Sequence, residues 1–400
     1  MKPGTTERHP GGTPILDREA PLPGCSSPGP GPRVVLGIVA SLCVGIVSLL
    51  VLWQPPFVGS LQQWIRLQIE ELFPGSWTFG RILFVGLFSI LIGFSVTAIH
   101  ELGHLIVGVG VGFRCSSMFL GPLQFNAPFR ISLNPDVRSW WHGGVTLVPG
   151  DPGEFWARAI AMVFAGPGAN LLTGCALLLL PFPKGFFSWL FIAASIGAGV
   201  TELLLPLRGA TFVFDGRRIW MLLRERARGE RWLALMRLIA DARDGASPES
   251  MSVELLAKAT AVRDESTDTV IAHAFAYSAA FHQHNDAEAA QMLETCLRYA
   301  GHAAPAMREG LMSDAAVFQA RRRMRHDLAD EWLGTIPLNT PHRWFRSRAE
   351  AAILEAQGDT AGALEKLAEV EAAIRRLPES AQRETLLRLL ERWKNELCGS

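Results

Sequence analysis

The chain has 400 residues, and its 38 Lys and Arg residues balance its 38 Asp and Glu residues, for a formal net charge of +0. This balance argues against a nucleic-acid-binding protein, which usually carries a clear excess of basic residues. The hydrophobic fraction is 49% and the mean hydropathy is +0.20. Apolar runs are concentrated in residues 34–207 and charges after residue 207. We therefore expect a protein that is part membrane-embedded and part soluble.

Residues 1–33 are dominated by proline and glycine. Such a composition cannot bury a hydrophobic core and predicts a disordered segment. The apolar run that follows is long enough to span a bilayer, so it is typical of an anchor and not of a cleaved leader. The 6 cysteines are scattered and form no CxxC pair. Their spacing indicates neither a disulfide framework nor a cysteine zinc site.

Four apolar segments have about the length of 20 residues that a bilayer requires. The predicted membrane spans are residues 34–53, 81–111, 157–182 and 186–207. An amphipathic stretch at 61–73 is predicted to lie at the membrane interface. The fold class expected from these segments is an α-helical polytopic membrane protein.

Residues 113–150, between the second and third predicted spans, have a different pattern. The segments 123–126 and 129–133 alternate between apolar and polar residues, and prolines and paired glycines separate them. This pattern predicts short β-strands. We expect a small β-rich segment associated with the membrane.

Positive charges predict the orientation. Arginines follow the fourth span and populate the loop between the second and third spans, whereas the opposite loops contain only Arg66 and Lys184. The positive-inside rule then places both termini in the cytosol, with the opposite orientation as the alternative. The proline- and arginine-rich composition suggests a bacterial inner membrane.

From about residue 229 to residue 400 the sequence is rich in Ala, Leu, Glu and Arg and predicts a soluble all-α domain. The stretches 277–297 and 351–367 each contain a similar turn and lie about two tetratricopeptide periods apart. Residues 314–333 would supply a further helix pair. We predict a tetratricopeptide-like helical-repeat domain, with an irregular helical bundle as the alternative. The expected domains are 1–33, 34–228 and 229–400.

The second predicted span contains the sequence His100-Glu101-Leu102-Gly103-His104. Positions i and i+4 share one face of a helix, so His100 and His104 can bind one zinc ion with Glu101 beside them as general base. Solvated histidines on a surface helix are the simpler interpretation of such a short motif. Its apolar flanks disfavour that interpretation, because ionisable residues at membrane depth usually have a function.

Two histidines leave a catalytic zinc ion one protein ligand short of the usual three. The candidates for the third ligand are Asp215, His142, Glu202 and Asp151. Asp215 follows the fourth span at the cytosolic end, level with the histidine motif in the expected topology. It could instead only cap the helix that begins at Gly216.

The chain resembles the site-2 proteases, a family of intramembrane zinc metallopeptidases, in four elements that occur in the family's order. They are the HExxH helix at 100–104, the strand at 143–150, the Ala-Gly-Pro element at 165–172, and the elements at 204–206 and 214–216. Together they lie within residues 80–220, roughly a third of the chain. The chain departs from the family where it has Leu203 in place of the usual Asn, and in a longer gap before Asp215.

The resemblance implies that Asp215 is the third zinc ligand and that Glu101 deprotonates a zinc-bound water that attacks the scissile carbonyl. It also implies that Asn170 lines the site and donates a hydrogen bond to the developing oxyanion. A structural hydrogen bond between helices is the alternative role for Asn170. An extended substrate segment would pair with the strand region, residues 123–147.

The expected function is that of a zinc metalloendopeptidase that cleaves a membrane protein substrate in or near a spanning segment. The expected cofactor is one Zn²⁺ per chain, and the expected partners are the lipid bilayer, the substrate and a protein that binds the helical domain. A catalytically silent membrane scaffold is the main alternative, although Glu101 is retained. A zinc transporter is a second alternative, which the small number of spans disfavours.

Overall fold

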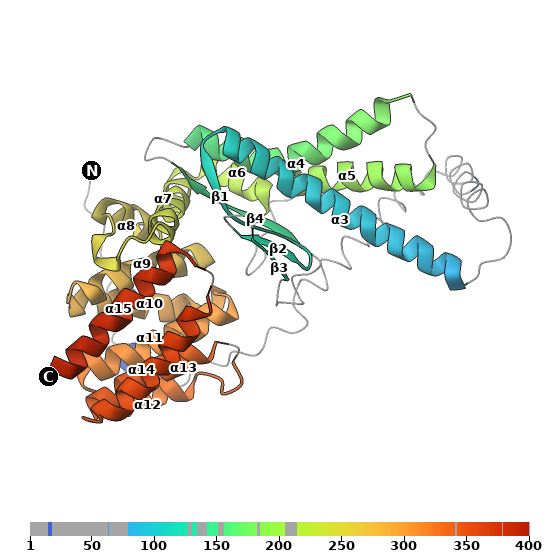
Figure 1. The fold of residues 1–400 in the computed structure, drawn as a ribbon. Helices are drawn as coiled ribbons and strands as arrows, with labels where there is room; N and C mark the ends of the chain where they lie inside the picture. The colour runs from blue at the N-terminus through green and yellow to red at the C-terminus, as the bar shows by residue number, and fades with distance from the viewer. Residues whose placement is uncertain are drawn as a thin grey trace, which may run out of the picture. The chain divides into compact units, whose positions relative to one another are not determined.

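The structure is a computed structural model, and its described part contains 13 α-helices and one small β-sheet (Figure 1). The chain divides into two compact units, one formed by Met1–Ser26 with Glu230–Ser400 and the other by Ser27–Gly229. The structure describes residues 15–17, 63, 79–126, 130–133, 142–150, 156–181, 185–204, 214–340, 342–377 and 379–399.

Three helices of the second unit are long and apolar enough to cross a membrane. They are α3 (Phe79–Gly110), α4 (Trp156–Leu179) and α5 (Phe186–Leu204). Large apolar side chains stand exposed along them, as expected for surfaces that face lipid. The second, third and fourth predicted spans are thus confirmed as membrane-length apolar helices. The predicted span at 34–53 lies outside the described residues, as does the interfacial segment 61–73 apart from Gln63.

Glycines let the three apolar helices approach closely. A Cβ atom on Gly103 of α3 would lie 2.4 Å from the Ala165 carbonyl oxygen of α4. A Cβ atom on Gly199 of α5 would lie 2.8 Å from the Pro167 carbonyl oxygen. Small residues at such crossings allow backbone-to-backbone packing in apolar surroundings.

The sheet is antiparallel, with strand order β3-β2-β1-β4. Its strands are β1 (Phe113–Leu120), β2 (Leu123–Asn126), β3 (Arg130–Leu133) and β4 (Gly143–Pro149). The predicted strands near 123–126 and 129–133 are confirmed. β1 was not predicted, because its sequence lacks a clear alternation. β4 pairs only with β1 among the described strands, so its other edge is unpaired there.

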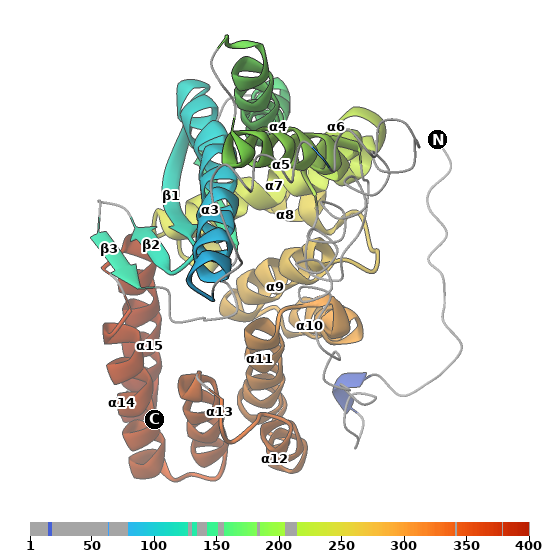
Figure 2. The same cartoon turned by 90° about the vertical axis from the view of Figure 1, so that its right-hand side faces the viewer.

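The chain leaves the apolar helices through α6 (Asp215–Arg224) and α7 (Arg226–Arg243), and the unit boundary falls within α7. The rest of the first unit is helical (Figure 2). Its helices are α8 (Val253–Thr260), α9 (Thr267–His282), α10 (Asp286–Tyr299), α11 (Pro305–Arg323), α12 (His326–Gly334), α13 (Arg343–Ala356), α14 (Thr360–Arg375) and α15 (Ala381–Gly399).

Three helix pairs of this unit are joined by turns of one kind. The turns place His284, Met324 and Gly358 in the left-handed region, with φ of 58°, 52° and 80°. The next residue is in each case the N-cap of the second helix; Asn285 and Asp359 accept a hydrogen bond from a backbone N–H there. Such side-chain caps satisfy amide groups that the first helical turn leaves free. The pairs α9–α10, α11–α12 and α13–α14 include all three predicted helix pairs.

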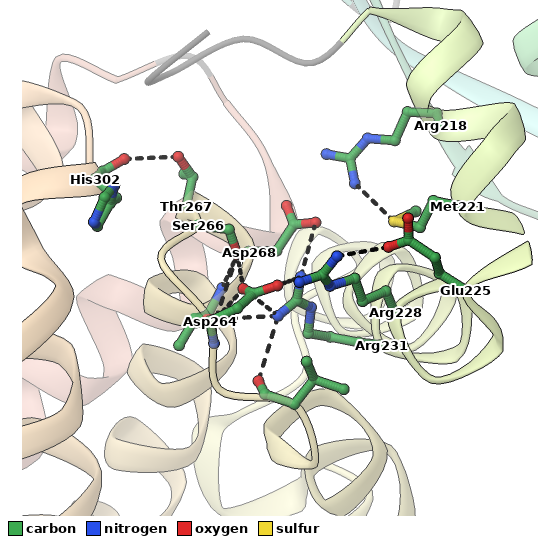
Figure 3. A network of polar contacts seen from close by, with 12 residues as sticks. Arg218, Met221, Glu225, Arg228, Arg231, Asp264, Ser266, Thr267, Asp268 and His302 are labelled. Carbon is green, nitrogen blue, oxygen red and sulfur yellow. Dashed lines mark hydrogen bonds and ion pairs between the residues drawn. The ribbon is translucent and has the colours of Figure 1, made fainter. Parts of the chain in front are cut away.

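Arg231 at the start of α7 is buried, with 2% of its surface exposed, and pairs with the loop before α9 (Figure 3). Its guanidinium donates to the Asp264 carboxylate at 2.8 Å and to the Thr269 hydroxyl at 3.0 Å. Burial raises the pKa of Asp264, but hydrogen bonds from Arg231 and Ser266 outweigh it and hold this pKa well below its usual value. The ionised pair therefore anchors the part of α7 that contains Arg231 to the loop before α9.

One short segment near the N-terminus differs from the prediction. Ile15–Asp17 forms a 3-10 helix, η1, and only 1% of the Leu16 surface is exposed. Leu16 belongs to the hydrophobic core of the helical unit. The prediction that residues 1–33 bury no core is therefore wrong at this point, because an average over a Pro- and Gly-rich stretch hides two adjacent apolar residues.

Candidate metal centre

The HExxH residues lie on α3, and Asp215 is the first residue of α6. The Oδ2 atom of Asp215 lies 3.1 Å from the Nε2 atom of His100 and 3.1 Å from the Nε2 atom of His104. The two Nε2 atoms also lie 3.1 Å apart. The structure thus brings the three predicted ligands together in a nearly equilateral triangle, and they form its candidate metal-binding group among the described residues.

The hydrogen bonding of His104 indicates which of its nitrogens faces this triangle with a lone pair. Its Nδ1 atom lies 2.7 Å from the Met162 carbonyl oxygen, which can only accept a hydrogen bond. Nδ1 therefore carries a hydrogen, and in a neutral ring Nε2 presents a lone pair. This is the pattern of metal-ligating histidines, whose second nitrogen donates to a carbonyl or carboxylate oxygen.

Hydrogens on the two Nε2 atoms alone do not give good hydrogen bonds among His100, His104 and Asp215. If both imidazoles were protonated, two N–H groups would face each other across 3.1 Å. If only one were protonated, the other nitrogen and the carboxylate would share a single hydrogen. A cation between the three atoms satisfies all of them at once. Ligands about 2.0–2.1 Å from a tetrahedral zinc ion lie about 3.3 Å apart, close to the observed 3.1 Å.

Glycines of two neighbouring elements make room for these side chains. A Cβ atom on Gly166 of α4 would lie 2.2 Å from His104 Nε2 and 2.8 Å from His100 Nε2. A Cβ atom on Gly143 of β4 would lie 2.8 Å from the Cγ atom of Glu101. Real Cβ atoms essentially never make contacts this short, so both positions require glycine as the site stands.

Glu101 lies beside the triangle and next to the first residues of β4. Its surface is 8% exposed, and the Val145 backbone hydrogen-bonds its carboxylate. A carboxylate this buried is expected to have a partner or a function. Its place between the two histidines and an edge strand suits a general base that acts on a peptide in extended conformation.

Asn170 of α4 contacts the far side of the His100 ring. Its surface is 1% exposed, and its side-chain nitrogen lies 3.4 Å from His100 Nδ1. Within the described part of the chain, its Oδ1 atom has no partner. Amide oxygen and nitrogen are assigned from their partners, and rotating the amide by 180° would let Oδ1 accept from a His100 Nδ1–H group. This contact favours a role for Asn170 in orienting His100.

Of the other candidates for the third ligand, Glu202 lies near the triangle without belonging to it, since it interacts electrostatically with Asp215, His100 and His104. Glu202, near the end of α5, hydrogen-bonds the Asp215 backbone and thereby holds the start of α6. His142 lies beside β4, where its carbonyl oxygen accepts from Gly121 N–H at 2.9 Å. Neither belongs to the group of three close ligand atoms. Asp151 lies outside the described residues. Glu202, a candidate ligand by sequence, instead supports the backbone of the residue that belongs to the group.

Comparisons with protein-family models, curated proteins and solved structures find no match for this chain.

Proposed function

We propose that this chain is a membrane zinc metalloendopeptidase of the site-2-protease type. The observation that carries the proposal is the convergence of His100, His104 and Asp215 on one point, with Glu101 beside them, at membrane-length apolar helices. Two imidazoles and one carboxylate are an established ligand set for a catalytic zinc ion. The helix-plus-aspartate arrangement also accords with the resemblance to site-2 proteases.

Zinc at this place would supply Lewis acidity, which acidifies water and polarises a carbonyl group. The protein's own residues supply the rest. Glu101 takes up the proton of the attacking water and passes it to the departing amine. Met162 and Asn170 hold the two imidazoles through their Nδ1 atoms. α3 and α4 supply the apolar surroundings in which these charges act more strongly than in water.

The substrate we propose is a membrane protein segment that becomes extended at the site. A peptide bond within a helix is closed to attack, whereas a strand exposes it. Among the described residues no strand pairs with the second edge of β4, and this strand begins at Gly143, beside Glu101. A substrate that adds to this edge by backbone hydrogen bonding would run past the catalytic carboxylate. The specificity of such pairing would come from side chains on alternate positions.

The helical unit is proposed to be a tetratricopeptide-like domain that binds a protein partner. Its three helix pairs share one turn geometry, and the turns at Met324 and Gly358 lie one tetratricopeptide period of 34 residues apart. A cavity of about 650 Å³ opens within this unit. Arg321, Arg322, Arg348 and Arg392 line it together with apolar side chains. Asp314 and Glu396 also line it and form ion pairs with Arg348 and Arg321, so its mixed charged and apolar surface suits an amphipathic peptide.

The test is cleavage of a panel of single-span reporter proteins in liposomes by wild type and by Glu101→Gln. Zinc is measured in both. Cleavage by wild type, its loss of about 100-fold or more in Glu101→Gln, and equal zinc in both are the expected results. The matched control is Glu254→Gln, at an exposed carboxylate of α8, which should cleave like wild type. Equal cleavage by Glu101→Gln would overturn the assignment of the base. Zinc in both proteins without cleavage would favour the silent scaffold.

A further inference from the structure

The N-terminal segment η1 is held against the helical unit by side chains that bind its main chain. The Glu294 carboxylate accepts hydrogen bonds from Ile15 N–H at 3.1 Å and from Leu16 N–H at 3.0 Å. The side-chain amide of Gln319 donates to the Leu16 carbonyl oxygen. Glu294 lies on α10 and Gln319 on α11, so two neighbouring helices hold three main-chain groups of one dipeptide. About 280–300 residues of sequence separate the partners.

The site also holds the side chain of the segment. Leu16 is 1% exposed and belongs to the same buried cluster as Leu293 and Leu297 of α10. Ile15 packs against this cluster at its margin. Apolar burial supplies the attraction, and the hydrogen bonds to the main chain set the register. Main-chain contacts beside a side-chain pocket are the arrangement by which domains recognise short peptides.

Gln319 indicates that the site is built for a peptide. Its residue surface is 0% exposed, and a buried amide is costly unless it is hydrogen-bonded. The Nε2 atom of Gln319 donates a hydrogen bond to the Leu16 carbonyl oxygen. Its Oε1 atom has no hydrogen-bond partner among the described residues. With the segment gone, this buried amide would be left without a partner. An isolated helical domain would carry an apolar residue there.

We infer that the helical unit carries a peptide-docking site between α10 and α11, and that its occupant is the chain's own Ile15-Leu16 segment. The docking is intramolecular, so its effective concentration is high and no free peptide needs to bind. The segment precedes the first predicted membrane span and the helical unit follows the last. The site therefore joins the two ends of the chain directly.

This contact has a consequence for membrane topology that rests on the membrane assignment of the proposed function. The two partners can meet only on one side of a bilayer, so the chain must cross it an even number of times between Asp17 and Glu230. The three candidate helices of the described residues are an odd number. The apolar run at 34–53, which lies outside the described residues, is the candidate for a fourth crossing.

The test is binding of a fluorescent peptide with the sequence of residues 11–21 to the full chain in detergent, followed by anisotropy. Leu16→Asp in the chain should vacate the site, because it places a carboxylate in an apolar pocket beside Glu294. The peptide should then bind this variant at least about tenfold more tightly than wild type, whose site is occupied. Equal binding to both proteins, or no binding to a folded Leu16→Asp chain, would overturn the inference.

Two controls distinguish specific docking from nonspecific peptide binding. In the Leu16→Asp chain, adding Gln319→Leu should weaken peptide binding by about tenfold or more, because a carbonyl loses its donor. Adding Lys258→Ala should not, because Lys258 forms only an exposed ion pair with Glu254 on α8. If Leu16→Asp fails to fold, a photo-reactive benzoylphenylalanine at Ile15 in the otherwise wild-type chain serves instead. It should crosslink to α10 or α11, and crosslinks confined to other regions would contradict the docking.

Discussion

Two of the buried polar clusters in the described part of the chain are satisfied in opposite ways. In the helical unit, the Arg231 cation faces the Asp264 anion and donates hydrogen bonds to it and to Thr269. At the apolar helices, His100, His104 and Asp215 turn three acceptor-type atoms toward one another. The first cluster pairs opposite charges with no bound ligand, and it serves stability. The second would be satisfied by a cation bound between the three atoms, as the proposed zinc centre requires.

The largest predicted effects come from removing one carboxylate from each cluster. The two substitutions should have opposite effects on zinc binding and on stability. Asp215→Ala should remove zinc that survives dialysis in wild type, while leaving the thermal unfolding of the metal-free protein nearly unchanged. Asp264→Ala should keep the zinc but destabilise the helical unit by about 1–3 kcal/mol, because Arg231 loses its nearer carboxylate and keeps only Asp268, at 3.9 Å. Zinc analysis and calorimetry on both variants check this. Zinc loss in Asp264→Ala with the fold intact would break the comparison.

Gly166→Ala should disable the proposed metal centre by steric overlap alone. Its Cβ atom would meet both ligand nitrogens, and a displacement of about 1 Å at reacting groups costs about 100-fold in rate. Reporter cleavage and zinc affinity measure the effect. Gly197→Ala on α5 is the matched control, because nothing lies within 4 Å of its Cβ position. Wild-type activity in Gly166→Ala would show that the two imidazoles do not converge as described.

Substitutions of Asn170 separate its two candidate roles. If its oxygen orients His100, Asn170→Ala should weaken zinc binding by about 10–100-fold, and Asn170→Asp, which still offers an acceptor, should retain it. If its nitrogen donates to an oxyanion, Asn170→Asp should keep zinc and lose turnover, because a carboxylate has no donor. Zinc titration together with kcat distinguishes the two results.

The smallest predicted effect concerns pH and the helical unit. Burial, together with nearby arginines, lowers the pKa of His282 from 6.5 to about 4, although Glu249 opposes the shift. Between pH 6.5 and about pH 4, His282 is protonated in the unfolded chain and neutral in the folded chain. The free energy of unfolding therefore decreases as the pH falls through this range. The loss between pH 7 and pH 5 should be about 1–2 kcal/mol. His282→Gln should remove this part of the pH dependence in denaturant unfolding.

The residues of the metal centre could be predicted because local chemistry carries the signal. The i, i+4 spacing of His100 and His104 fixes their common face, and Asp215 follows from the order of the elements and the resemblance. The Leu16 docking could not be predicted, because its partners Glu294 and Gln319 lie far away in sequence and look like ordinary helix residues. The resemblance implied that Asn170 lines the site, but its contact with His100 Nδ1 depends on how α4 packs against α3. The periodicity of a sequence predicts a helix or a strand, but it does not predict which other element packs against it.

The most direct test of the metal centre is zinc X-ray absorption on the dialysed wild-type protein, with His100→Ala as the comparison. The proposed centre predicts one tightly held zinc ion per chain, two imidazole ligands, further oxygen ligands and no sulfur. In His100→Ala, the imidazole signal should fall by half or the zinc should be lost. Wild-type protein without bound zinc, or a spectrum with sulfur ligands, would contradict the proposed centre.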